Sequence, residues 1–311
     1  MKRRYFLRAI PMLGLSALQT MPALAQRPRV SRLVIVGGAE DRLQDRLILR
    51  KFADHCGGPQ ARIRLITAAS GDPQGVWHSY QQAFNALGVF DVEPLAIYDR
   101  DSAQSPEVQA EILQADGIFI SGGDQSKLMA ILWDSWAYQS LHQSFYLNRC
   151  CIGGTSAGAA VMSRHMIAQG PAVLRATKEA VDTDMGLGLL SQAVVDQHFS
   201  ERRRLPRLLS TLAMRPDLLG VGIDEDTALV IERDVGIEVI GQGSVTLVDP
   251  SQMRSNVDEL ETLESIEMLG VQLHFLPAGH RYHLSTIGQD ARSAPLRRAV
   301  QRLVTLGPMR A

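Results

Sequence analysis

Short runs of β-branched residues alternate with longer amphipathic stretches through the first half of the chain, and this alternation constrains its fold more than any other feature. The predicted strands span residues 32–36, 62–67, 92–97, 117–120 and 150–153. Helical patterns separate them at about 41–56, 73–87, 106–113 and 125–147, several closed by glycine. Repetition of strand, helix and strand predicts an α/β fold whose mostly parallel sheet carries helices on both faces.

The second half continues with a basic helix from Glu201 to about Met214 and then a series of further strands. These strands are predicted at 220–223, 227–231, 237–240 and 245–248, with the spacing of antiparallel pairs. Internal repeats, low-complexity tracts and obvious linkers are absent from the sequence. We therefore expect residues 26–311 to form a single α/β domain with a mixed, antiparallel C-terminal extension.

The first 25 residues differ in kind from the rest and predict a cleaved signal peptide. Basic residues at positions 2, 3, 4 and 8 precede an uncharged, mostly apolar stretch. The run Arg3-Arg4-Tyr5-Phe6-Leu7 resembles the twin-arginine export signal, and Ala23-Leu24-Ala25 fits the small-x-small rule for cleavage before Gln26. A membrane anchor is the alternative, but prolines interrupt the stretch and a span needs about 20 residues.

Removal of the signal peptide would change the formal net charge from −1 to −5, because the segment carries four positive charges and no negative ones. Such a balance gives no reason to expect a nucleic-acid partner. No second apolar segment is long enough to cross a bilayer, so we expect a mature form without a membrane partner, in the periplasm or outside the cell.

The three cysteines predict neither a structural disulfide nor a metal site. Cys150 and Cys151 are adjacent, whereas zinc sites use separated pairs, and Cys56 leaves the total odd. Packing at the end of a buried strand is the role that their positions favour.

The strand at 150–153 runs into Gly154-Thr155-Ser156-Ala157-Gly158, which has the form of a nucleophile elbow, Gly-x-Ser-x-Gly. Small neighbours let a serine occupy a strained turn at a helix N-terminus, where the Ala157 N–H can face a developing oxyanion. On this pentapeptide alone, a phosphate cradle or simple tight packing stays open. The turn at Gly122-Gly123 can supply a second oxyanion donor, and Gly37-Gly38 can line the same crevice, unless these glycines only turn the chain.

A serine nucleophile needs a base and an acid. Among the eight histidines, His198 is favoured by its place at the exit of a predicted strand over residues 193–199. Another strand exit carries Asp224, Glu225 and Asp226, and residue patterns do not choose among them. The order serine, histidine, acid differs from the α/β-hydrolase order, in which the base would be His274, His280 or His283.

A cluster of arginines follows His198, at positions 202, 203, 204 and 207. A solvated helix face would explain it, with Arg203 and Arg207 on one side. Its position one turn after the base favours binding of carboxylates, which arginine grips in a bidentate fork.

Taken together, the residues resemble the serine peptidase family that contains the cyanophycinases and the aspartyl dipeptidases. The resemblance covers most of the chain from residue 34 to residue 229. The matching segments, in chain order, are 122–125, 153–159, 186–190, 196–199 with the arginines after it, and 222–228.

The resemblance implies roles for specific residues. Ser156 would be the nucleophile, His198 the base and Glu225 the acid, with the Gly123 and Ala157 N–H groups as oxyanion donors. The residues implied to bind the substrate are Gln125, Asp196, Gln197, Arg202, Arg204 and Arg207. It also implies a flavodoxin-like fold related to class I glutamine amidotransferases, a homodimer, and no metal or cofactor.

The implied substrate is cyanophycin, a polyaspartate whose β-carboxyls carry arginines through isopeptide bonds. Each repeat presents a carboxylate and a guanidinium, and the arginine cluster with Asp196 and Glu225 offers both signs of charge. Cleavage through an acyl-enzyme on Ser156 would release β-Asp-Arg dipeptides from a chain end.

Two alternative functions stay open. One is an aspartyl or isoaspartyl dipeptidase, which the long segment after Ile231 disfavours. The other is a non-catalytic sugar or peptide binder on an amidotransferase-like fold.

Overall fold

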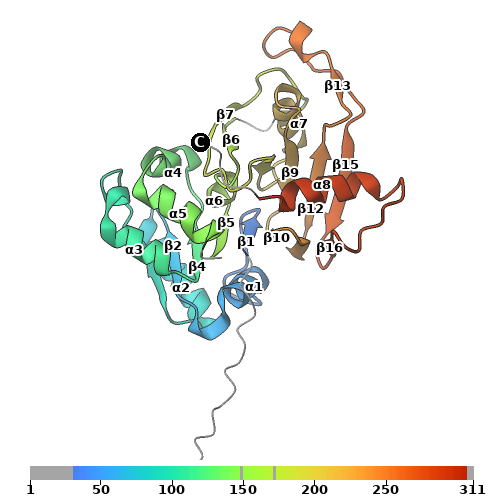
Figure 1. Ribbon diagram of the computed structural model, residues 1–311. Coiled ribbons are helices and arrows are strands. Elements are labelled where there is room, and N and C mark those ends of the chain that lie inside the picture. The colour runs from blue at the N-terminus through green and yellow to red at the C-terminus, as the bar shows by residue number, and fades with distance from the viewer. Residues whose placement is uncertain (1–30, 148–149, 171–172, 307–311) are drawn as a thin grey trace, which may run out of the picture.

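The computed structural model describes residues 31–147, 150–170 and 173–306 (Figure 1). The predicted signal peptide, residues 1–25, lies outside the described residues and stays a prediction. Within the described ranges, no helix combines the length and the apolar character needed to cross a membrane.

The main sheet has eight strands in the order β16-β11-β10-β1-β5-β4-β2-β3. Its parallel strands are β1 (Arg32–Val36), β2 (Ile63–Ile66), β3 (Val92–Pro94), β4 (Gly117–Ile120) and β5 (Cys151–Thr155). The antiparallel strands are β10 (Thr227–Glu232), β11 (Gly236–Gly241) and β16 (Arg281–His283). The series β3-β2-β4-β5 follows the flavodoxin order, and β1 takes the next position although it comes first in the chain. This arrangement confirms the predicted α/β class.

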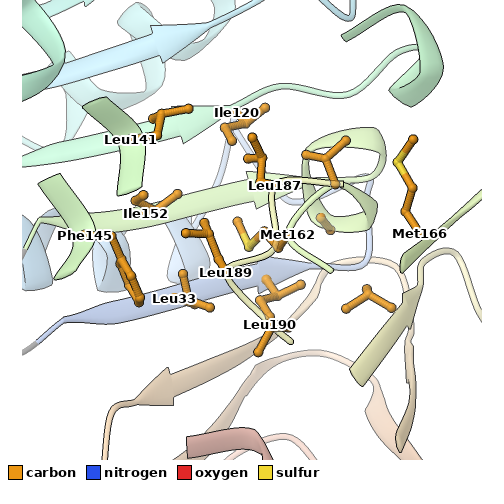
Figure 2. Close-up of a cluster of buried hydrophobic side chains, with 14 of the residues drawn as sticks. Leu33, Ile120, Leu141, Phe145, Ile152, Met162, Met166, Leu187, Leu189 and Leu190 are labelled. Atoms are coloured by element: carbon orange, nitrogen blue, oxygen red, sulfur yellow. The ribbon is translucent and has the colours of Figure 1, made fainter. Parts of the chain in front are cut away.

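Helices cover both faces of this sheet, as predicted. Alternate residues of β1 point to opposite sides, with Leu33 and Ile35 in one apolar cluster and Val34 and Val36 in the other. One face packs against α1 (Leu47–Cys56) and α2 (Pro73–Ala86). The other packs against α3 (Pro106–Gln114), α4 (Gln125–Leu132), α5 (Trp136–Tyr146) and α8 (Ala294–Val304). Figure 2 shows this second cluster, where strand side chains lie beside those of α5 and of the 187–190 segment.

The later strands do not all extend the main sheet. A second sheet has the order β15-β12-β9-β8 and is built from β8 (Ala193–Asp196), β9 (Leu219–Ile223), β12 (Ser244–Asp249) and β15 (Gln272–Pro277). Within it β8 and β9 are parallel, and the other pairs are antiparallel. Residues 224–226 carry the chain from β9 in the second sheet to β10 in the main sheet.

The remaining elements are short. Two hairpins pair β6 (His165–Gln169) with β7 (Asp182–Met185) and β13 (Arg254–Ser255) with β14 (Met268–Leu269). The other helices are α6 (Ala157–Ala160) and α7 (Leu205–Met214), with single 3-10 turns at Gly58–Gln60, Ser102–Gln104 and Val257–Glu259. Cys56, Cys150 and Cys151 are all buried, the last as the first residue of β5.

Two predicted helices begin later than expected. The helix predicted over 41–56 starts at Leu47, because the Asp41 carboxylate accepts the N–H groups of Leu43, Gln44 and Arg46 and holds a non-helical turn. The helix predicted from Glu201 starts at Leu205, with a proline in its first turn and Arg203 at a φ of 52°. The expectation that Arg203 and Arg207 share a helix face was therefore wrong.

The helix predicted over 125–147 is two helices. Asp134, at a φ of 56°, interrupts the pattern between α4 and α5. Ser135 then caps α5, because its hydroxyl oxygen accepts the Tyr138 N–H at 3.1 Å.

Candidate active site

Ser156 lies on the turn between β5 and α6, in a strained backbone conformation with φ 52° and ψ −112°. Its N–H donates to the Val36 carbonyl at 3.1 Å, which ties the turn to the end of β1. The flanking positions are glycines because there is no room for a side chain. A Cβ on Gly154 would lie 2.5 Å from the Gly158 carbonyl oxygen, and one on Gly158 would lie 2.2 Å from that of Ile120. Close backbone approach thus explains the Gly-x-Ser-x-Gly pattern.

His198 follows β8 and faces Ser156 across the junction of the two sheets. Its Nε2 lies 3.0 Å from Ser156 Oγ. Its backbone N–H donates to the Gly37 carbonyl at 2.7 Å, and its ring lies against Gly38, where a Cβ would come within 2.3 Å of Cε1. The Gly37-Gly38 turn therefore does line the crevice, as the sequence indicated.

Of the three neighbouring carboxylates, only Glu225 meets His198. Its Oε1 lies 2.5 Å from His198 Nδ1. Asp224 instead accepts hydrogen bonds from Ser200 and Ser244, and Asp226 accepts the Asp41 N–H. Geometry thus makes the choice that residue patterns left open.

Burial lowers the pKa of His198 below its ordinary value, and the charges of Arg202 and Arg204 lower it further, while Glu225 acts in the opposite direction. The imidazole is therefore neutral at neutral pH. With the Nδ1–H donated to Glu225, the Nε2 lone pair is free to accept the Ser156 proton.

The two predicted oxyanion donors belong to two turns next to the serine, the 122–123 turn and the start of α6. A Cβ on Gly122 would lie 3.2 Å from Ser156 Cβ, which places the 122–123 turn beside the hydroxyl. Within the described residues, neither the Gly123 N–H nor the Ala157 N–H has a hydrogen-bond acceptor. Both groups are free to donate to an oxygen on the substrate, and their assignment as the oxyanion site stays a prediction.

Asp196 and Arg207, both expected to bind substrate, are buried and paired with each other. Asp196 is 1% exposed and Arg207 is 4% exposed. Arg207 Nε donates to Asp196 Oδ2 at 2.8 Å, a second bond joins Nη2 to Oδ1, and Nη1 donates to the Gly170 carbonyl. This bidentate pair lies beneath the surface, so it supports the wall of the site from behind.

The other implied substrate residues differ in exposure: Gln197 is buried, Gln125 and Arg204 are partly buried, and Arg202 is exposed. Arg204 donates to the backbone carbonyl of Gln197 at 2.6 Å and also to its side-chain oxygen, and burial lowers the Arg204 pKa to about 10. Gln125 donates to the Ile167 and Ala168 carbonyls at 3.1 and 2.6 Å, so it anchors β6. Arg202 is exposed, and its side chain makes no hydrogen bond or ion pair within the described part of the chain.

The histidines of the α/β-hydrolase alternative lie elsewhere. His274 is in β15, while His280 and His283 lie beside or in β16. His283 lines a cavity of about 500 Å³ near the start of β1. Three cations of that cavity are ion-paired with Glu232 and Glu238, and neither Ser156 nor His198 lines it. Within the described residues, no cluster of three or more His, Cys, Asp or Glu side chains is placed to hold a metal ion.

One buried charge near the site was missed by the sequence analysis. Glu40 accepts hydrogen bonds from the hydroxyls of Thr155 and Tyr80, and Thr155 immediately precedes Ser156. Its signal in the sequence is weak: an acidic residue just after the glycine turn of the first strand, at the sheet edge where α/β folds bind ligands.

A serine on a strained strand-to-helix turn, in line with a histidine and a glutamate, is the arrangement of a serine-type hydrolase. A model of Peptidase family S51 matches residues 33–239. The chain is 39% identical to a cyanophycinase of Trichormus variabilis over 85% of this chain and 92% of that one. It is 40% identical to a cyanophycinase of Synechococcus elongatus, over 82% of this chain and 79% of that one. The chain belongs to Peptidase family S51 and is a serine-type peptidase.

A solved structure shares the fold. A peptidase from an acI-B1 Actinobacterium matches with a TM-score of 0.58 and 23% identity, covering 82% of this chain and 97% of that one.

Proposed function

We propose that the chain is an exported exopeptidase that hydrolyses cyanophycin to β-Asp-Arg dipeptides through an acyl-enzyme on Ser156. The observation that carries the catalytic part is the line from Ser156 Oγ through His198 to Glu225, with separations of 3.0 and 2.5 Å. The substrate is supported by the cyanophycinases of Trichormus variabilis and Synechococcus elongatus, which align with this chain over 92% and 79% of their lengths.

In the first half of the proposed reaction, Ser156 Oγ attacks the carbonyl carbon of a backbone aspartyl peptide bond. The hydroxyl proton passes to His198 Nε2, and Glu225 stabilises the imidazolium that forms. The Gly123 and Ala157 N–H groups donate to the oxyanion. Collapse of the tetrahedral intermediate breaks the C–N bond, His198 returns its proton to the leaving amine, and the acyl group stays on Ser156 as an ester.

In the second half, water attacks the ester and His198 Nε2 takes a proton from it. Collapse of the second intermediate breaks the bond to Ser156 Oγ, which recovers its proton from His198. The products are a free carboxylate and a regenerated enzyme, and no redox step or cofactor is needed.

The residues named from the sequence differ in how well they could bind the charged groups of the substrate. Arg202, whose side chain is exposed and unpaired within the described residues, is the cation best placed to bind a carboxylate of the polymer. Asp196 is neutralised by Arg207, so it is not the partner of a substrate guanidinium. Glu225 has a side chain that is 35% exposed and uses only Oε1 toward His198, which leaves negative charge facing the substrate.

Export and assembly are further parts of the proposal. Residues 1–25 would be removed, and the mature homodimer would act on polymer released by other cells. N-terminal sequencing of the protein recovered outside the cytoplasm should start at Gln26. Recovery from the cytoplasm with the N-terminus intact would refute export, and sedimentation of the purified protein as a monomer would refute the dimer.

The test of activity uses the mature protein and insoluble cyanophycin granules. We expect loss of turbidity with release of β-Asp-Arg, detected by mass spectrometry. Ser156→Ala should abolish both, whereas the exposed serine variant Ser251→Ala should leave them unchanged. Hydrolysis of a short aspartyl peptide without clearing would indicate a dipeptidase. Granule binding without any hydrolysis by the wild type would indicate a binding protein.

A further inference from the structure

Glu40 is a buried carboxylate beside the nucleophile turn, and the proposed chemistry does not use it. Its side chain is 2% exposed. The carboxylate accepts a hydrogen bond from Thr155 Oγ1 at 2.5 Å and another from the Tyr80 hydroxyl. The nearest ion-pair partner is Arg42, whose Nε lies 4.0 Å away. Burial of a carboxylate costs free energy, so a buried carboxylate next to Ser156 needs an explanation.

The hydrogen bond from Thr155 connects Glu40 directly to the turn that carries Ser156. Thr155 is the last residue of β5 and shares a peptide bond with Ser156. That peptide N–H donates to the Val36 carbonyl at 3.1 Å, and Ser156 has a φ of 52°, which few surroundings tolerate. Because hydrogen bonds to a charged acceptor are stronger than those between neutral groups, the carboxylate restrains Thr155 more firmly than an amide would.

The segment that carries Glu40 also contacts the base and the turn that carries the acid. The Gly37 carbonyl accepts the His198 N–H at 2.7 Å, and Gly38 packs against the His198 ring. The Gly38 carbonyl accepts the Asp226 N–H at 2.8 Å, one residue after Glu225. Three of the four residues after β1, Gly37, Gly38 and Glu40, thus touch the turns that present the three site residues.

We propose that Glu40 is a positioning residue, which acts through Thr155 to fix Ser156 Oγ against His198 Nε2. The inference rests on the proposed role of Ser156 as nucleophile. Tyr80 donates to the other oxygen of the Glu40 carboxylate. Its ring is fully buried beside Phe84 and Phe119, and burial raises the pKa of its hydroxyl. The hydroxyl therefore stays protonated and donates.

Two variants test this positioning role, each with a matched control. Tyr80 donates to Oε1 of Glu40 and Thr155 donates to Oε2, so Glu40→Gln keeps the volume but places an amide NH2 opposite one of the two hydroxyls. Thr155→Val keeps the shape and removes the hydroxyl, whereas Thr155→Ser restores it. Glu238→Gln is the control for loss of a partly buried glutamate, because Glu238 is ion-paired with Lys51 and Arg281 next to the cavity near the start of β1.

The readouts are kcat and KM on granules and the rate at which a fluorophosphonate labels Ser156. We expect Glu40→Gln and Thr155→Val each to lower kcat and the labelling rate by about 10- to 100-fold, the effect of a displacement of up to about 1 Å, with KM within twofold. Thr155→Ser should recover at least a third of the wild-type kcat, and Glu238→Gln should retain it. The double variant should be no worse than the poorer single variant, because both changes break one connection.

The proposal is overturned if Glu40→Gln and Thr155→Val melt at lower temperature yet keep wild-type kcat and labelling rates. It is also overturned if their effects multiply in the double variant, or if Thr155→Ser fails to recover activity. If Glu40→Gln does not fold, the two Thr155 variants decide. Wild-type protein that neither labels at Ser156 nor clears granules would instead refute the proposed function.

Discussion

The replacement Gly38→Ala tests how the position of the His198 ring affects the rate. A Cβ at this position would lie 2.3 Å from His198 Cε1 and 2.5 Å from Nε2, whereas ordinary contact begins at 3.4 Å. The ring must therefore move by roughly 1 Å, and a misplacement of about that size costs about 100-fold in rate. We expect kcat to fall by about 100-fold while KM changes little, because Gly38 has no part in the proposed substrate contacts.

The assay is steady-state release of β-Asp-Arg, together with fluorophosphonate labelling of Ser156. Gly38 has a φ of +106°, so alanine also introduces backbone strain. Gly88→Ala controls for this, because Gly88 has a φ of +84° and a Cβ added there would meet no heavy atom within 4 Å. The control should lose about 1 kcal/mol of stability and keep its kcat. Retention of wild-type kcat by Gly38→Ala would refute the claim that this glycine sets the position of the His198 ring.

Two further predictions concern charge. Arg202→Gln removes a positive charge that lowers the His198 pKa, so the acid limb of the kcat/KM profile, expected below about pH 6.5, should move to higher pH; a limb that stays fixed or moves lower would contradict this. Asp196→Ala leaves the buried Arg207 uncompensated and should cost about 3–5 kcal/mol in urea unfolding. Asp217→Ala, which breaks the more exposed pair with Arg215, should cost less than about 1 kcal/mol, and equal losses would show that burial does not matter here.

The parallel half of the fold was predictable because its strands are buried on both faces and appear in the sequence as short apolar runs. The first residues of the helices were harder to predict, because single polar side chains determine where a helix begins. Asp41 holds a turn where the apolar pattern already looks helical, and Ser135 caps a new helix inside a continuous pattern. The Ser135 cap could have been read from the sequence. The division of the later strands between two sheets could not, because strand pairing depends on contacts between distant residues.

For the site, the Gly-x-Ser-x-Gly turn indicated Ser156 and a strand exit favoured His198, and the family resemblance implied their roles. Local sequence could not separate Glu225 from its two acidic neighbours, since that choice depends on which side chain reaches His198 Nδ1. Asp196 and Arg207 were both expected to bind substrate, and only the structure shows that they are buried and paired with each other. Glu40 was missed because an acid in a loop usually faces solvent, whereas this one is buried.

The site residues come from different sheets, and this has a mechanical consequence. Ser156 follows β5 of the main sheet, whereas His198 and Glu225 follow β8 and β9, which are hydrogen-bonded neighbours in the second sheet. Base and acid therefore share one sheet, and a shift of that sheet against the main sheet would change the Oγ to Nε2 separation while it leaves the imidazole and carboxylate in contact. The reactivity of Ser156 would then depend on how the two sheets are held together, and the Gly37 and Gly38 carbonyls contribute to this by accepting the N–H groups of His198 and Asp226.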